Sequence, residues 1–228
     1  MAADAINEVW LFGSRARGEA YEGSDTDVLV VCEDRTVPRA ARTWLATRFG
    51  EHVDVAHYSY RGLGRLVQQG SLFAWHLRCE GIPVCRPVNR LQGMLRAMAP
   101  YSRHTEDLEV LCTVFDEAAE SLACRRATYF DLGVVATAVR NAGIIMSDLC
   151  GCRDFSPSAP LRLPQLSDVP TLPLSRLAYE GLSACRRASE RGAPLEGTLP
   201  QPDDVAAMLV GLRAWLYGCL ECAEARGR

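Results

Sequence analysis

Two aspartates, one residue apart, open an apolar stretch near the start of the chain. Asp25 and Asp27 precede the run Val28–Val31, which has no polar break and is typical of a strand buried on both faces. Because side chains alternate along a strand, both carboxylates point one way and Thr26 the other. Two such carboxylates repel unless a cation lies between them, and their hard oxygen atoms favour Mg²⁺ or Mn²⁺. The pair therefore predicts a divalent-metal site at the rim of a sheet.

A glycine-serine turn lies a short distance ahead of this pair. Glu8–Phe12 is typical of a short strand, and Gly13-Ser14 separates it from a helix-like stretch over Arg15–Glu19. Glycine lets the backbone approach a ligand closely, a serine hydroxyl donates a hydrogen bond, and free amides at a helix start favour an anion. The residues expected to contact phosphate oxygens are Gly13, Ser14, Arg15 and Arg17.

In-line phosphoryl chemistry also needs a carboxylate that accepts the proton of an attacking hydroxyl. Asp54 is the predicted residue, because 52–58 alternates polar and apolar side chains as a strand does. The stretch 36–49 before it is typical of the helix that connects two strands. Asp34 and Glu51 are also near in sequence, and both look like solvated loop acids.

The order of these features resembles that of a known family. A hydrophobic residue, Gly-Ser, about ten residues and then Asp-x-Asp-hydrophobic, here Phe12 to Val28, is similar to the pattern of the DNA polymerase beta-like nucleotidyltransferase superfamily, specifically its small bacterial members. Arg-x-Arg-Gly at 15–18 and Ser24 match the minimal members. Residues 70–81 resemble the segment that often closes this domain, so the likeness covers roughly 7–86.

The resemblance implies a metal-dependent enzyme that transfers a nucleoside monophosphate, AMP from ATP by default, to an acceptor hydroxyl with release of pyrophosphate. It implies that the catalytic and metal-binding residues are Asp25, Asp27 and Asp54. It implies that the nucleotide-binding residues are Gly13, Ser14, Arg15, Arg17 and Ser24. The chain departs from relatives in having no lysine, so any role of lysine must pass to arginine, which binds phosphate as a planar fork.

Beyond Pro87 the pattern changes to helical periodicity, which predicts an α+β chain. We expect a small mixed nucleotidyltransferase sheet flanked by helices in 1–87 and an all-α helical bundle in 88–228. Since only six residues precede Asn7, part of the cover of the sheet is expected to come from elsewhere. Two amphipathic helices are predicted from the spacing of Leu108, Leu111, Cys112, Phe115, Ala119 and Leu122, and of Val205, Met208, Leu209, Leu212, Trp215, Leu216, Cys219 and Leu220.

The helix predicted over 129–149 is apolar almost all round and should be the most buried one. Within it, Arg140 and Asn141 either line a substrate cleft or bind neighbouring loops or acids. Residues 156–173 carry five prolines and predict an extended loop, a lid or a tether.

This plan resembles the fusion of a minimal nucleotidyltransferase with a HEPN-like helical domain. Active HEPN ribonucleases carry an arginine, then about four to six residues, then a histidine. Here seven residues separate Arg96 from His104, the last histidine, so ribonuclease activity is not expected. The helices are expected to form the far wall of an acceptor pocket or the surface of a homodimer.

Composition limits the partners. The formal charge of −3 and pI of about 5.9 do not suggest a broad nucleic-acid surface, and no stretch was expected to span a membrane. The two short-spaced cysteine pairs, at 150 and 152 and at 219 and 222, lack a second pair or a following histidine at zinc-finger spacing. No secretory segment opens the sequence, so we expect reduced thiols and a cytoplasmic location.

The acceptor is left open between a small molecule and a protein. An aminoglycoside- or lincosamide-modifying enzyme would use an acidic cleft, for which the chain offers Glu19, Glu22, Asp107, Glu109, Asp116, Glu117 and Glu120. A protein-AMPylating component of a toxin–antitoxin pair would present an open, partly apolar groove. A non-catalytic nucleotide-binding module is the third alternative.

Overall fold

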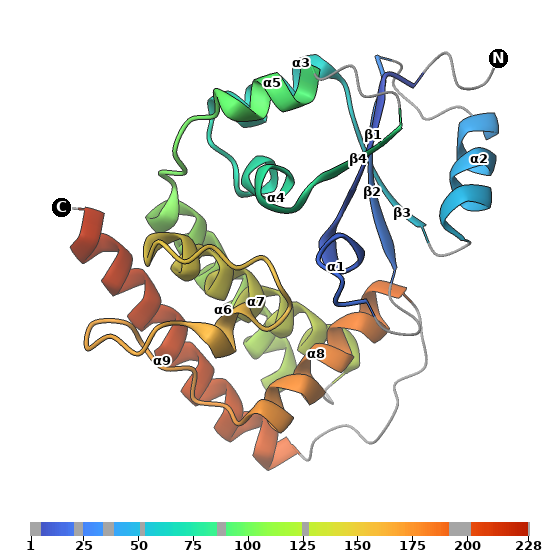
Figure 1. The fold of residues 1–228 in the computed structure, drawn as a ribbon. Coiled ribbons are helices and arrows are strands. Elements are labelled where there is room, and N and C mark those ends of the chain that lie inside the picture. Colours follow the sequence, from blue (N-terminus) through green and yellow to red (C-terminus); the bar gives the residue numbers. More distant parts are fainter. Residues whose placement is uncertain are drawn as a thin grey trace. The chain divides into compact units, whose positions relative to one another are not determined.

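The computed structural model describes residues 6–20, 25–33, 39–50, 53–85, 90–124, 128–191 and 202–227 (Figure 1). The chain divides into two compact units, Met1–Ser102 and Arg103–Arg228. The first unit carries a sheet and the second is helical, so the predicted α+β class is confirmed.

The first unit is built on a four-stranded mixed sheet with the strand order β3-β2-β1-β4. Its strands are β1 (Glu8–Phe12), β2 (Thr26–Val31), β3 (Val53–Tyr58) and β4 (Ile82–Cys85). β1 runs antiparallel to β2 and β4, whereas β2 and β3 are parallel. The side chains of Val28–Val31 are fully buried in the central strand β2, as their unbroken apolar sequence predicted.

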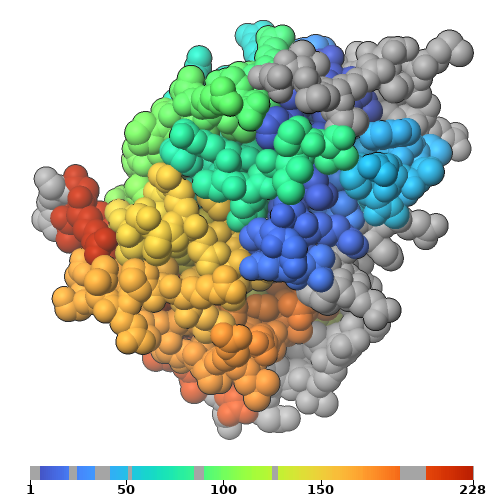
Figure 2. All heavy atoms as spheres, viewed as in Figure 1, coloured from blue at the N-terminus to red at the C-terminus, as the bar shows by residue number. Residues whose placement is uncertain are grey.

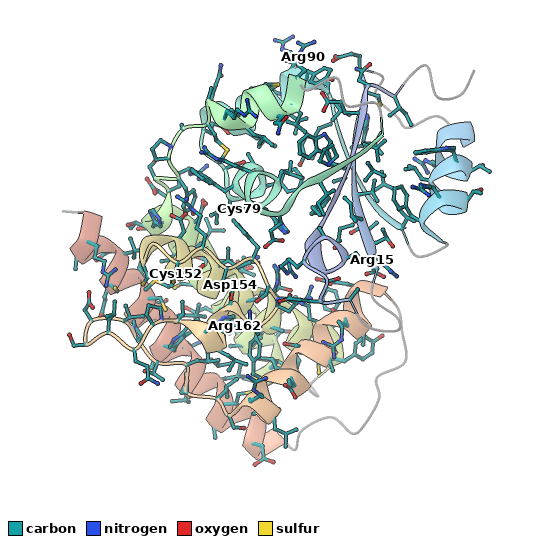
Figure 3. The ribbon with its side chains drawn as sticks, viewed as in Figure 1. Arg15, Cys79, Arg90, Cys152, Asp154 and Arg162 are labelled. Atoms are coloured by element: carbon teal, nitrogen blue, oxygen red, sulfur yellow. The ribbon has the colours of Figure 1, made fainter. Side chains whose placement is uncertain are left out.

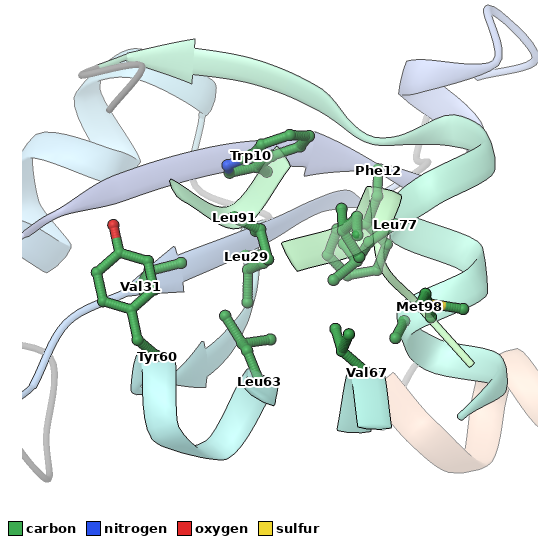
Figure 4. Close-up of a cluster of buried hydrophobic side chains, with 12 residues drawn as sticks. Trp10, Phe12, Leu29, Val31, Tyr60, Leu63, Val67, Leu77, Leu91 and Met98 are labelled. Carbon is green, nitrogen blue, oxygen red and sulfur yellow. The ribbon is translucent and has the colours of Figure 1, made fainter. Parts of the chain in front are cut away.

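Each face of the sheet is covered by its own helices, because successive side chains along a strand point to opposite faces. One face presents Trp10, Phe12, Leu29 and Val31 to α3 (Tyr60–Gln68), α4 (Leu72–Glu80) and α5 (Arg90–Arg96), and Figure 4 shows this cluster. The other face presents Val9, Val28 and Val30 to Leu45 of α2 (Arg39–Phe49). The central strands β1 and β2 are therefore packed on both faces, whereas the residues of edge strand β3 are only partly buried or exposed.

Helices α3 and α4 begin at serine caps. The Ser59 hydroxyl accepts a hydrogen bond from the amide of Gly62 at 3.1 Å, and the Ser71 hydroxyl accepts one from Ala74 at 3.2 Å. A capped start satisfies an amide that the helix itself leaves without a partner. The cap on α4 matters most, because this helix supplies side chains to the candidate site described below.

Helix α5 belongs to the cover of the sheet. Leu91, Leu95 and Met98 are buried in the same cluster as Trp10, so residues after the expected boundary at 87 pack within the first unit. The compact unit therefore extends to Ser102, and the second begins at Arg103, just before α6. Part of the sheet's cover thus comes from a segment that periodicity alone had placed with the helical bundle.

The second unit contains four long helices and one short 3₁₀ helix within the described residues. They are α6 (His104–Cys124), α7 (Tyr129–Leu149), η2 (Ala159–Arg162), α8 (Arg176–Arg191) and α9 (Pro202–Gly227). α7 packs against all the others, which agrees with its predicted burial. At Gly143 a Cβ atom would lie 2.5 Å from Cγ of Pro160, so glycine allows η2 to pack directly on the α7 backbone.

Side chains from three helices donate hydrogen bonds to backbone carbonyls in and next to the proline-containing loop at 156–173. Arg140 of α7 donates to the carbonyl of Phe155 at 3.1 Å, Tyr179 of α8 to Pro157 at 2.6 Å, and Trp215 of α9 to Pro170 at 3.0 Å. Asn141 accepts a further bond from Arg140 at 3.1 Å. In this structure Arg140 therefore has the loop-binding role that was one of its two predicted alternatives.

Two helices are long and apolar enough to cross a membrane by length and composition, contrary to the expectation that no stretch approaches such a span. They are Tyr129–Leu149, with 72% of its most apolar window buried inside the protein, and Asp204–Gly227, with 33% buried. The first helix is buried to the extent that is typical of the core helix of a bundle. For the second helix, length and apolar composition alone are weak evidence of a membrane span.

Candidate functional site

Two carboxylates meet where β2 and β3 begin. In the parallel register Asp27 stands directly opposite Asp54, on strands that are about 4.8 Å apart in any sheet. Both are on the face covered by α3 to α5, whereas Thr26 points to the α2 face and donates to the carbonyl of Phe49 at 3.3 Å. The structure thus places Asp27 and Asp54 side by side, and Asp25 comes two residues before Asp27 at the same end of the sheet.

The carboxylate of Asp27 is half-buried, whereas that of Asp54 is exposed. Burial raises the pKa of Asp27 above its usual value, and the negative charges of Asp54 and Asp25 raise it further. The charges of His76 and Arg17 act in the opposite direction. An ionised Asp27 is therefore costly here, and a cation beside it would relieve that cost.

Gly13 makes room for the Asp27 side chain. Phe12 is the direct antiparallel partner of Asp27, so the turn after β1 passes next to the aspartate. A Cβ atom on Gly13 would lie 2.1 Å from Oδ2 of Asp27, and its φ of +72° is in the left-handed region. Glycine is thus needed here both for the backbone conformation and for the space that the carboxylate occupies.

The turn after β1 forms the short helix α1 (Gly13–Ala16) at the surface of the first unit (Figure 2). The predicted helix over 15–19 begins two residues earlier than expected and ends sooner, because Gly18 adopts a left-handed φ of +72°. Ser14 is half-buried and Arg15 is exposed; Figure 3 shows the side chain of Arg15 beside this turn. Ser24 lies outside the described residues.

Arg17, Glu80 and His76 form a network beside the acids. Arg17 donates from Nη1 to Oε2 of Glu80 at 2.6 Å and from Nε to Glu19 at 2.7 Å. His76 Nε2 is 2.8 Å from the same Oε2 atom of Glu80. The side chains of Arg17, Glu80 and His76 are each only 13–15% exposed. The network joins the end of α1 to α4.

Opposed influences set the charge of this network. Burial alone would raise the pKa of Glu80, but its hydrogen bonds to His76 and Arg17 outweigh that and lower the pKa below its usual value. Burial alone would lower the pKa of Arg17, but its bonds to Glu19 and Glu80 raise it. Glu80 and Arg17 are therefore ionised at neutral pH and bound to each other.

Sequence reasoning missed His76 and Glu80. They are four residues apart on α4 and so lie on one face of the helix, a spacing that the sequence shows. The segment 70–81 was expected to close the domain, but no periodicity indicates that this helix face meets the arginine at 17.

The donor chemistry of the three aspartates fits a hard divalent cation, since carboxylate oxygen atoms are the ligands that Mg²⁺ and Mn²⁺ prefer. The space left by Gly13 is occupied by one such oxygen, Oδ2 of Asp27. As the side chains stand, no three acidic, histidine or cysteine residues of the described ranges gather closely enough to form a complete metal site. Asp27 and Asp54 thus share one face of the sheet without forming a closed ligand set.

Comparison with known proteins shows a similarity in the part of the chain that carries these residues. Residues 3–67 match the family model of the nucleotidyltransferase domain. The match includes Gly13 and the three aspartates, and it ends before α4, so His76 and Glu80 lie beyond it. A search of curated proteins found no match to the chain. The resemblance inferred from the Gly-Ser and Asp-x-Asp pattern is confirmed.

Proposed function

We propose that the protein transfers a nucleoside monophosphate from a nucleoside triphosphate, ATP by default, to a hydroxyl group of a small molecule or a protein, with release of pyrophosphate. The observation that supports this best is that Asp27 of β2 and Asp54 of β3 lie opposite each other beside the Gly13 turn. The match of residues 3–67 to a nucleotidyltransferase domain supports the same class of reaction.

The three aspartates have different surroundings and therefore different proposed roles. Asp25 and Asp27 would hold Mg²⁺ or Mn²⁺, with Asp54 as a third ligand; such ions neutralise charge on the phosphate and on the attacking and leaving oxygens. Asp54 is exposed beside Asp27, where its carboxylate can accept the proton of an acceptor hydroxyl. The hydroxyl oxygen then bonds to the α-phosphorus while the bond to the pyrophosphate oxygen breaks.

The Gly13 turn binds the phosphate chain in this proposal. The half-buried hydroxyl of Ser14 donates to a phosphate oxygen, and the exposed guanidinium of Arg15 adds positive charge at the surface of the turn. Arg17 lies within reach of the same region but is bound to Glu80 and Glu19. Its charge is therefore fixed in position by two carboxylates.

Pyrophosphate release tests the proposal directly. The protein is incubated with Mg²⁺ and each of the four nucleoside triphosphates labelled at the α-phosphate, in turn with pooled aminoglycosides, pooled lincosamides and a bacterial lysate. We expect pyrophosphate and label transfer with one triphosphate and one pool. The pool that receives label distinguishes an antibiotic from a protein as the acceptor.

Asp27→Asn is the control, because the amide keeps the shape of the carboxylate and removes its charge. It should abolish release while the far-ultraviolet circular dichroism spectrum stays that of the wild type. Full release by Asp27→Asn would overturn the proposed mechanism. Triphosphate binding by the wild type without release in any pool would identify a nucleotide-binding module instead.

A further inference from the structure

The Arg17–Glu80–His76 network lies beside the acids, and Glu80 and His76 have no role in the proposed chemistry so far. Its position follows from three contacts. Phe12 pairs with Asp27 across the sheet, the His76 ring meets the Phe12 ring edge-on with centroids 5.3 Å apart, and Arg17 follows directly after α1. Both basic side chains thus reach the end of the sheet where Asp27 stands.

One oxygen of Glu80 holds both basic groups. Oε2 is 2.6 Å from Arg17 Nη1 and 2.8 Å from His76 Nε2, and the three side chains are almost buried. Such charge-assisted bonds in a low-dielectric setting are short and fix the orientation of their partners. A guanidinium carries five N–H donors, of which Nε and Nη1 here bind Glu19 and Glu80. Glu80 therefore orients the arginine while neutralising no more than one positive charge.

The acids and this network together match the two needs of a metal–nucleotide complex. Carboxylates suit the cation, and oriented N–H donors such as the Arg17 guanidinium suit the oxygens of the phosphate chain. Burial, Asp54 and Asp25 raise the pKa of Asp27, while His76 and Arg17 lower it, which agrees with two basic groups at short range. Both basic groups therefore lie near enough to Asp27 to contact a phosphate chain that binds beside it.

We propose that Glu80 is a positioning residue that holds Arg17 and His76 toward the phosphate chain of a bound nucleoside triphosphate, beside Asp27. The inference deepens the proposed function and rests on it, because the ligand is the donor of that reaction. It predicts that Glu80 strengthens binding of triphosphates far more than binding of monophosphates, which lack the outer phosphates.

Equilibrium binding tests this without turnover. The probes are the α,β-methylene analogues of ATP, GTP, CTP and UTP, which cannot release pyrophosphate, and the four matching monophosphates, all with Mg²⁺. We expect Glu80→Gln to weaken binding of the preferred triphosphate analogue about tenfold and to leave the monophosphate nearly unchanged. A merely structural role would lower both affinities alike.

Glu19→Gln is the matched control. Glu19 binds the same guanidinium through Nε, but its side chain is 43% exposed, so its loss should leave the ratio of the two affinities unchanged. Unchanged triphosphate binding in a folded Glu80→Gln would overturn the proposal, as would an equal loss in Glu19→Gln.

Two more variants keep the test valid if Glu80→Gln does not fold. Glu80→Asp should restore part of the triphosphate preference, and His76→Gln should lose part of it. Wild-type affinity ratios in both would overturn the proposal. Nucleotide binding by the wild type without pyrophosphate release contradicts the proposed function alone. Pyrophosphate release with unchanged binding in the Glu80 variants contradicts this inference alone. If the wild type binds no nucleotide, both are contradicted.

Discussion

Gly13 is the residue at which backbone conformation and site chemistry depend on each other. An alanine there would place its Cβ 2.1 Å from the Asp27 carboxylate and would hold a left-handed φ that costs a substituted residue about 1–2 kcal/mol. We expect Gly13→Ala to abolish pyrophosphate release, because the carboxylate must move away. Release assays and thermal unfolding measure the two effects separately.

Gly18 supplies the control for this substitution. It has the same φ of +72°, but an added Cβ would meet nothing within 4 Å. Gly18→Ala should therefore lose about 1 kcal/mol of stability and keep its activity. Equal activity loss in both variants would show that left-handed strain, and not the contact with Asp27, explains the effect.

The ionised side chain of Asp27 is predicted to destabilise the folded protein in the absence of a bound cation. Burial and the charges of Asp54 and Asp25 raise its pKa, so the folded state binds its proton more tightly than the unfolded state does. The tighter proton binding stabilises the folded state. This contribution is fully present below the pKa of Asp27 in the unfolded chain, and it is lost as pH rises through its pKa in the folded protein. At about pH 7 the ionised side chain is unfavourable, and Asp27→Asn should melt at a higher temperature than the wild type.

Thermal unfolding in a chelating buffer, at neutral pH and again near pH 3, checks this sign. The advantage of Asp27→Asn should shrink as the wild-type carboxyl takes up its proton. A variant that melts lower than the wild type at neutral pH would contradict the prediction. The same substitution should remove activity under the proposed function, so the expected result is a more stable but inactive protein.

At the scale of elements, the buried carboxylate of Glu8 ties β1 to two helices. It is 1% exposed and accepts bonds from Trp10 Nε1 at 2.9 Å, from the Tyr60 hydroxyl at 2.6 Å and from the Leu91 amide at 3.1 Å. Glu8→Ala leaves these donors without an acceptor and should cost about 3 kcal/mol in urea unfolding.

Glu8→Gln separates the bonds of the two oxygens. One amide oxygen can still serve Tyr60 and Leu91, but the new NH₂ group faces the indole N–H of Trp10. We expect a smaller loss of about 1 kcal/mol, and we expect Trp10→Phe to remove most of it in the double variant. Equal losses with and without Trp10 would show that the clash does not arise.

The elements also show how far sequence could predict the site. The alternation along 25–27 predicted the sheet face of Asp27 and the opposite face of Thr26, since strand geometry is local. The choice of Asp54 needed only a second strand in parallel register. His76 and Glu80 could not be predicted, because they meet Arg17 through packing of α4 on the sheet, a contact between segments far apart in the chain.

The boundary between the two regions was harder to predict for the same reason. Periodicity marks α5 as a helix, but not which core it joins. Leu91 and Leu95 pack with Trp10 and Leu29, so the division falls at Ser102. The long helices of the second region were easier to find, because each carries an apolar repeat over many turns.

At the scale of the whole molecule, the first unit carries everything that a stable domain needs. Both hydrophobic clusters of the sheet lie within residues 1–102, and so do the acids and the Arg17–Glu80–His76 network. Compact domains of about 100 residues commonly fold alone.

A chain ending at Ser102 should therefore unfold in one cooperative urea transition and bind the triphosphate analogue that the full chain prefers. A chain ending at Pro87 should do neither, because it lacks the buried leucines of α5; cooperative unfolding of the shorter chain would show that α5 is dispensable for the core.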